Sequence, residues 1–281
     1  MKYFLLSLLI ICYISTFSQE LRLKKRTSTA LSGSEFSQAI RDTALSLDER
    51  ENIIFNEIKS GNIPDFYRNF IEIKDTITSK GKSHTIRYFV APDFIAIGSN
   101  ENYFYCPMKA QLAQKVANLL KCSLPTRKIS DKIYQNAIVK MVPEPIPPSP
   151  QMITIPVFEK HNRLVNTQRQ LSVHQYPLGS LVAGNKKDVV ISNKIYNDKG
   201  VLRVVIYGWH KPDGKAIQLL YNGHSSIHVD YSHGIRMVLN KIWVNGKKTS
   251  MQKVLRSNTL HPLLSDEGII ALPVYPTMGE R

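Results

Sequence analysis

Residues 201–246, "VLRVVIYGWHKPDGKAIQLLYNGHSSIHVDYSHGIRMVLNKIWVNG", decide the fold class of this chain. Their valine and isoleucine content predicts β-strands at 201–210, 226–231 and 233–246. The turn signals "PDGK" and "VNGK" lie among these strands, and Asn-Gly is a strong hairpin signal. Since no crossover helix separates the strands, the sequence predicts a mostly antiparallel sheet and argues against a doubly wound fold.

The chain before this sheet shows helical and strand patterns in turn. Apolar residues spaced near 3.6 from Ser34 onward, and again in "MKAQLAQKVANLLK", predict amphipathic helices, with a small alternating sheet between them. Five prolines in "VPEPIPPSP" predict an extended linker between lobes or a strap on the surface. The predicted fold class is α+β. N-terminal helices and a small sheet occupy residues 35–142, a Pro-rich connector 143–150, and an antiparallel-sheet part that carries the site 151–281.

The first 34 residues are not expected to belong to the fold. Residues 1–18 resemble a signal peptide in pattern, with a positive start, a short apolar run and small residues at Thr16 and Ser18. Ile11 before Cys12 argues against a lipoprotein box, and an uncleaved N-terminal anchor is the alternative. Residues 19–34 are polar and basic, which predicts a disordered lead-in. The expected location is secreted or periplasmic, with no transmembrane segment after cleavage.

The net charge predicts an anionic partner. The chain carries 37 basic and 22 acidic residues, a formal charge of +15, and removal of residues 1–18 takes away only Lys2, which leaves +14. A basic secreted protein is attracted to polyanions, so an anionic cell-envelope polymer is the expected partner. The basic residues are scattered, and no specific nucleic-acid motif is present. The oligomeric state is not predicted.

Residues 221–238 hold three of the eight histidines. If residues 227–231 form a strand, alternation places His228 and Asp230 on one face. The following turn would bring His233 alongside, and His224 in the preceding turn is the alternative third ligand. Histidine and aspartate are zinc ligands, so the cluster would suit zinc, and Asp188 offers a further carboxylate. No cofactor motif such as H-E-x-x-H is present, and the alternative is a hydrogen-bonded polar strand and turn.

A cysteine activated by histidine is the second chemistry that the sequence allows. Cys122 precedes a predicted helix, whose N-terminal dipole would stabilise a thiolate. A disulfide between Cys106 and Cys122 stays open, because two cysteines in an exported chain can also pair.

This order of a cysteine at a helix start and a histidine on a sheet resembles the NlpC/P60 papain-like cell-wall peptidases over residues 122–238. The resemblance implies a cysteine peptidase that acts on peptidoglycan. It also implies that His228 or His233 is the base and that Asp230 or His210 orients the imidazole. Those enzymes usually show an Asp-Cys-Ser-Gly run, whereas "KCSL" keeps Cys122 and Ser123 but has Lys121 and Leu124 beside them. The second half also looks like a group of uncharacterised secreted bacterial proteins with the pattern "YGWH…DGxxIQ…LYxGH…DYSHG", which implies no mechanism.

Two hypotheses of different classes follow. The first is a secreted hydrolase that acts on a cell-envelope polymer, with a peptidoglycan amide bond as the expected target. The second is a non-catalytic envelope- or glycan-binding protein, and a secreted nuclease is a third option without a motif. A catalytic site needs the histidines to converge in a cleft, whereas a binding face spreads them along an exposed aromatic ledge. The expected substrate-binding residues are Trp209, His210, Tyr221, His224 and Tyr231.

Overall fold

The structure is a computed structural model, which describes residues 19–79 and 81–277. Helices and largely antiparallel sheets make up this part of the chain, so the α+β prediction is confirmed. The expected signal peptide, residues 1–18, lies outside the described residues and stays a prediction. No helix among the described residues has the length and apolar character needed to cross a membrane.

The larger sheet joins strands from both sides of the Pro-rich connector. Its strands are β1 (Gln19–Glu20), β2 (Asn69–Ser79), β3 (Lys82–Val90), β6 (Cys122–Ser123), β13 (Val238–Leu239), β14 (Lys241–Val244) and β15 (Lys247–Ser250). They run in the order β1-β2-β3-β13-β6, and the β14–β15 hairpin also pairs with β3. Asn245 and Gly246 close that hairpin with φ of 49° and 77°, so the predicted Asn-Gly turn is confirmed.

A second sheet carries the polar cluster. Its order is β11-β10-β9-β12, made of β9 (Lys187–Val189), β10 (Ile206–His210), β11 (Ala216–Tyr221) and β12 (His233–Gly234). The short strand β12 pairs parallel with β9, which places His233 opposite Lys187. Two small pairs complete the strands: β4 (Ala96–Gly98) with β5 (Tyr103–Tyr105), and β7 (Val139–Lys140) with β8 (Val182–Ala183).

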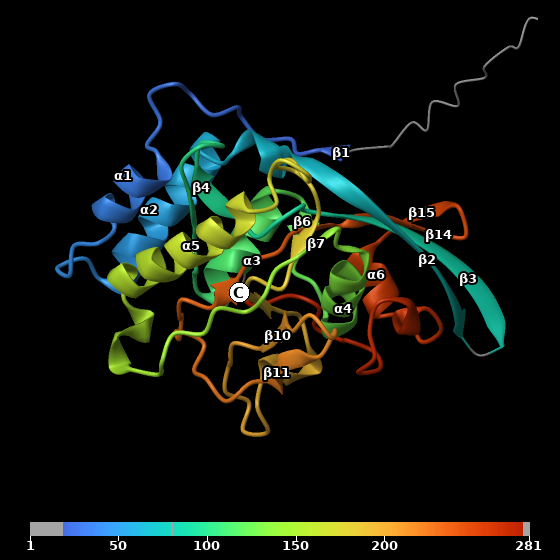
Figure 1. The fold of residues 1–281 in the computed structure, drawn as a ribbon. Coiled ribbons are helices and arrows are strands. Elements are labelled where there is room, and N and C mark those ends of the chain that lie inside the picture. The colour runs from blue at the N-terminus through green and yellow to red at the C-terminus, as the bar shows by residue number, and fades with distance from the viewer. Residues whose placement is uncertain (1–18, 80, 278–281) are drawn as a thin grey trace, which may run out of the picture.

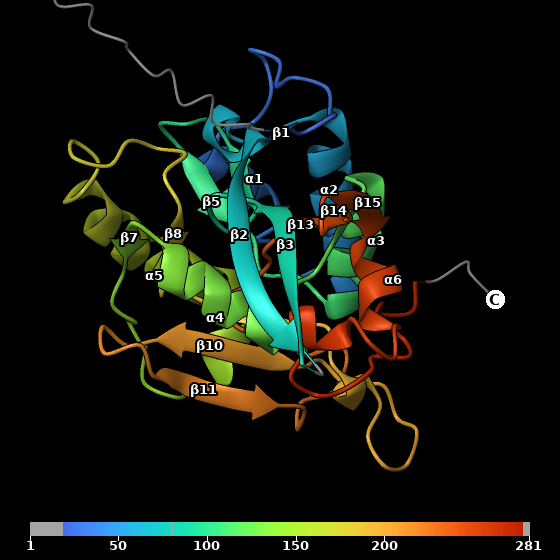
Figure 2. The ribbon, with the colours of Figure 1, turned by 90° about the vertical axis from the view of Figure 1, so that its right-hand side faces the viewer.

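Six α-helices surround the sheets in the described part of the chain. They are α1 (Gly33–Ala39), α2 (Leu47–Ser60), α3 (Ala110–Leu119), α4 (Arg127–Asn136), α5 (Ile155–Gln170) and α6 (Met251–Leu255), with short 3₁₀ helices η1 (Asp65–Arg68), η2 (Pro150–Ile153), η3 (Asn193–Ile195) and η4 (His261–Leu263). Gly61 ends α2 at a φ of 93°, as its position predicts. The β2–β3 hairpin reaches beyond the helices (Figure 1), and a quarter turn shows α4 and α5 on one side of it and α2, α3 and α6 on the other (Figure 2).

The predicted disorder of residues 19–34 is wrong. β1 pairs with β2, and Leu21 is buried against the core. Arg26 donates hydrogen bonds to the Asn62 side chain at 2.9 Å and to the Ala30 carbonyl at 2.6 Å. The polar composition of this segment predicted disorder, but Arg26 is held by an acceptor on Asn62, outside the segment, and by one within it.

Two local expectations about the candidate site are also wrong. Residues 227–231 form turns and irregular loop instead of a strand, and the strand begins only at His233. Cys122 does not start a helix: it lies in β6, and α4 begins at Arg127 with Thr126 as its N-cap. Pairing of Cys122 with Leu239 in the larger sheet fixes it there, so the helix dipole expected to favour a thiolate acts several residues away.

The Pro-rich connector lies as a strap over the second half of the fold. The Ile146 N–H donates to the Tyr231 hydroxyl at 2.8 Å, and the Gln168 side chain of α5 bonds the backbone of Val142. Of the two alternatives for residues 143–150, the structure therefore has the surface strap.

Candidate metal centre

The loop between β11 and β12 holds the polar cluster in a fixed turn. The His228 N–H donates to the Ser225 carbonyl at 3.0 Å, and the His233 N–H donates to the Asp230 carbonyl at 3.1 Å. Oδ1 of Asp230 accepts hydrogen bonds from the N–H of Ser232 at 2.7 Å and from its hydroxyl. These bonds orient the carboxylate so that its other oxygen, Oδ2, faces two imidazoles.

His228, Asp230 and His233 converge on one point. Nε2 of His228 lies 3.7 Å from Oδ2 of Asp230, and Nε2 of His233 lies 3.6 Å from the same oxygen. One ligand atom from each residue lies within 4.8 Å of the others, and no further group of this kind occurs in the described residues. Tetrahedral zinc, with bonds of about 2.0–2.1 Å, holds its ligand atoms about 3.3 Å apart. The two histidine–aspartate pairs are a few tenths of an ångström longer than this, and the two imidazoles, whose ligand atoms lie within 4.8 Å, would close further around an ion.

His233 gives the strongest sign that the cluster is built for a ligand. The residue is 1% exposed, yet neither Nδ1 nor Nε2 has a hydrogen-bond partner. Separations of 3.6 Å are too long for a hydrogen bond. A buried polar group without a partner costs free energy, and native proteins satisfy nearly all of them. A metal ion at Nε2 would supply the missing partner.

The protonation states suit metal ligation. Burial lowers the pKa of His233 to about 4, although the nearby Asp230 opposes this shift. Burial would raise the pKa of Asp230, but His233, His228 and the Ser232 hydroxyl outweigh it and hold that pKa well below its usual range. At neutral pH the centre therefore presents a neutral imidazole and an ionised carboxylate, the forms that bind a metal.

Close approach of β12 to its neighbours requires the glycine after His233. A Cβ atom on Gly234 would lie 2.5 Å from Cδ1 of Phe94 and 2.8 Å from Cβ of Lys186. The "HG" dipeptide of the sequence thus reflects a packing need beside the candidate ligand.

His224 and Tyr221 lie on the solvent side of the centre. The His224 and His228 rings are stacked with centroids 4.0 Å apart, and Tyr221 meets His224 edge-on at 5.1 Å. Tyr221 is 43% exposed. Of the expected substrate-binding residues, these two lie against the candidate ligands and near solvent.

The backbone just before His210 has an unusual conformation. Gly208 and Trp209 both have left-handed φ, 103° and 56°, next to a bulge in the β10–β11 pairing. Trp209 is buried and packs edge-on near Tyr231, with ring centroids 6.3 Å apart. His210 instead bonds Asp131 at 2.9 Å. Trp209, Tyr231 and His210 are therefore buried, and they do not form an exposed aromatic ledge.

A buried lysine lies behind the centre, and the sequence reading missed it. Nζ of Lys186 donates to the Tyr231 carbonyl at 2.6 Å and lies 3.1 Å from Nδ1 of His161. Burial lowers the pKa of Lys186 to about 7 and that of His161 to about 2. The sequence signal that could have indicated Lys186 is the "NKKDVV" stretch, in which two lysines directly precede a Val-rich strand. Asp188 in that strand is buried, and burial raises its pKa to about 6.

The cysteines are not arranged as a disulfide or as an activated nucleophile. Cys106 and Cys122 are both free and buried. The Cys122 thiol donates to the Leu120 carbonyl at 3.4 Å, and burial raises its pKa. A raised pKa disfavours the reactive thiolate. In the described residues, no hydrogen bond or ion pair joins Cys122 to His228, Asp230 or His233.

A cavity of about 390 Å³ opens beside the centre and contains a second carboxylate. His228 and Val229 line it from the loop, and Glu51 lines it from α2. Glu51 accepts a hydrogen bond from the Lys109 N–H at 2.8 Å, and burial raises its pKa to about 7. No sequence pattern pointed to Glu51, because it lies 177 residues before His228 in the numbering of the chain.

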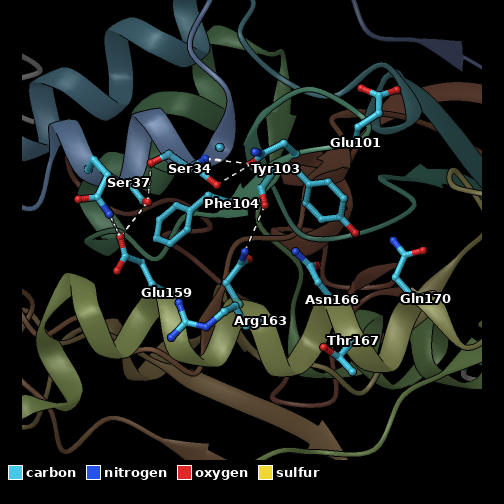
Figure 3. A pocket seen from close by; sticks show the side chains of 14 residues that line it. Ser34, Ser37, Glu101, Tyr103, Phe104, Glu159, Arg163, Asn166, Thr167 and Gln170 are labelled. Carbon is cyan, nitrogen blue, oxygen red and sulfur yellow. Dashed lines mark hydrogen bonds between the residues drawn. The ribbon is translucent and has the colours of Figure 1, made fainter.

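A polar hollow of about 480 Å³ adjoins this cavity through Phe104, which lines both. Figure 3 shows the α5 side chains Glu159, Arg163, Asn166 and Gln170 facing Ser34, Ser37 and Tyr103 across it. Glu159 accepts hydrogen bonds from Ser37 at 2.9 Å and from Gln38 at 3.1 Å. Polar groups of this kind can hold a hydrated ligand, but the candidate ligand His228 lines the other cavity.

A scan against protein-family models finds no match for this chain, and searches of the curated proteins and of the solved structures find none either. The two resemblances stated from the sequence therefore stay predictions.

Proposed function

We propose that this protein is a metal-dependent hydrolase whose divalent metal, zinc by the chemistry of the ligands, is held by His228, Asp230 and His233. The observation that carries the proposal is the buried His233 imidazole, which lacks a partner on either nitrogen and faces the Asp230 carboxylate at 3.6 Å. Three protein ligands are the usual complement of a catalytic zinc site, since they leave a position for substrate.

The residues around the centre have separable roles. Zinc would act as a Lewis acid toward a carbonyl and would make water a better nucleophile. Glu51 lines the same cavity and has a pKa near 7, which suits a general base at neutral pH. Ser232 orients Asp230 through two hydrogen bonds, so it is a positioning residue.

The substrate is a cell-envelope polymer in this proposal, and an amide bond of peptidoglycan is the expected target. The support is the formal charge of +15 and the signal-like start of the sequence. The convergence of the imidazoles beside a cavity favours this proposal over the alternative of a non-catalytic glycan-binding protein. The same geometry favours the metal over Cys122 as the activating element.

Zinc content and activity test the proposal together. After loading with zinc and dialysis, we expect one zinc per chain, measured by inductively coupled plasma mass spectrometry. We also expect the protein to release dye-labelled fragments from peptidoglycan, and EDTA to stop this release. His228→Gln and His233→Ala should lose the zinc, whereas His174→Ala, at an exposed histidine outside the centre, should keep it. Absence of bound zinc in the loaded protein would end the metal proposal. Activity that survives EDTA and disappears in Cys122→Ala would replace it with the cysteine route.

A further inference from the structure

The cavity beside the candidate metal centre is chemically asymmetric. Ten of its fourteen lining residues are apolar, and the four polar ones are Arg50, Glu51, Ser225 and His228. Phe104 and Phe158, like Ile40 and Ile54, are fully buried in the core, so the apolar wall reaches deep into the molecule. A cavity of about 390 Å³ falls within the usual size of small-molecule sites, about 300–1,000 Å³.

The mouth of the cavity is apolar as well. Ile153 in η2 is 53% exposed and Ile227 in the loop is 61% exposed, and both line the cavity. Ile227 directly precedes His228, so an apolar rim residue and a candidate metal ligand are adjacent in the chain. A ligand whose apolar part fills the cavity would therefore bring its polar end to His228 and Glu51.

We propose that this cavity binds an apolar group joined to a carbonyl, either an acyl chain or a large apolar side chain, and that the carbonyl lies toward His228. The inference rests on the proposed function and makes its substrate an amide with an apolar group beside the bond that is cut. A bare sugar chain does not match the apolar wall. Each methylene buried contributes about 0.8 kcal/mol, which is about a fourfold change in affinity.

Calorimetry on the metal-free protein tests the cavity without depending on hydrolysis. The probes are N-acetylglycine, N-hexanoylglycine and N-octanoylglycine for the acyl source, N-acetylphenylalanine for the side-chain source, and an N-acetylglucosamine trimer as the sugar. We expect affinity to rise about fourfold per methylene in the acyl series, or at least tenfold for the phenylalanine compound over N-acetylglycine, and no such gain for the sugar.

Rim variants locate the binding site. Ile153→Ser and Ile227→Ser should each weaken binding of the preferred probe at least fivefold, because both side chains line the apolar mouth of the cavity. Both variants should fold, because these side chains are exposed in the free protein. Leu171→Ser is the matched control, since Leu171 is 84% exposed and does not line the cavity. Affinity that does not depend on chain length, tighter binding of the sugar, or equal loss in the Leu171 variant would overturn the inference. Retained acyl binding in a protein that takes up no zinc would instead refute the proposed function alone.

Discussion

Nε2 of His233 lies 3.6 Å from Oδ2 of Asp230, and the imidazole has no hydrogen-bond partner on either nitrogen although its side chain is fully buried. A structural histidine is usually held by hydrogen bonds that offset the free-energy cost of burying its polar nitrogens. No such hydrogen bond to His233 occurs within the described residues. A ligand that both groups share would supply the missing partner.

The first prediction separates these two roles at His233. In the metal-free protein, His233→Leu should leave the melting temperature within about 3 °C of wild type, because no hydrogen bond is lost and a buried polar group is removed. The same variant should lose zinc binding, measured by competition with a chromogenic chelator. A fall of more than about 8 °C with zinc binding intact would show that His233 is structural.

The second prediction concerns Glu51. Glu51→Gln should reduce turnover of labelled peptidoglycan by about 10²–10⁴-fold, because a general base contributes an effect of that size, while zinc affinity changes less than twofold. Loss of zinc together with activity would instead assign Glu51 to metal binding.

Stability against pH gives an independent measurement on the same variant. Burial raises the folded-state pKa of Glu51 from 4.5 to about 7, so the folded protein binds more protons than the unfolded chain between those values. The contribution of Glu51 to stability therefore falls as pH rises through that window. The free energy of unfolding of Glu51→Gln minus that of wild type should therefore be larger at pH 8 than at pH 4. Urea unfolding of the metal-free proteins measures both free energies.

The third prediction concerns the buried lysine. The pKa of Lys186 falls from 10.5 to about 7, so between these values the unfolded chain carries a proton that the folded protein lacks. Wild-type stability should then rise with pH across this window, by up to about 1.4 kcal/mol per pH unit, relative to Lys186→Met. Urea midpoints of both proteins at pH 7, 8 and 9 measure this difference. A constant difference would mean that Lys186 stays charged when buried.

The fourth prediction concerns export. Cleavage after Ser18 should give a mature protein that begins at Gln19, as determined by mass spectrometry of the secreted chain. Gln19 pairs with Phe70 in the larger sheet, so cleavage at this bond would leave β1 intact. A secreted protein that retains residues 1–18 would contradict the prediction.

Local signals in the sequence determined much of the fold. The Asn245–Gly246 turn and the helical apolar spacing of residues 108–121, where α3 forms, were predicted because each depends on residues within a few positions of one another. The same holds for the concentration of histidine around Asp230, which marked the candidate site.

The tertiary structure alone decided what that concentration means. The loop at residues 227–231 was mistaken for a strand because Ile227 and Val229 alternate with polar residues, whereas tight turns at Ser225–His228 and Asp230–His233 bend the chain. Glu51 and Lys186 acquired their pKa shifts from burial, which depends on elements distant in the chain. The sequence thus determined which ligand types are present, and packing decided which of them meet, because burial and convergence are properties of the whole fold.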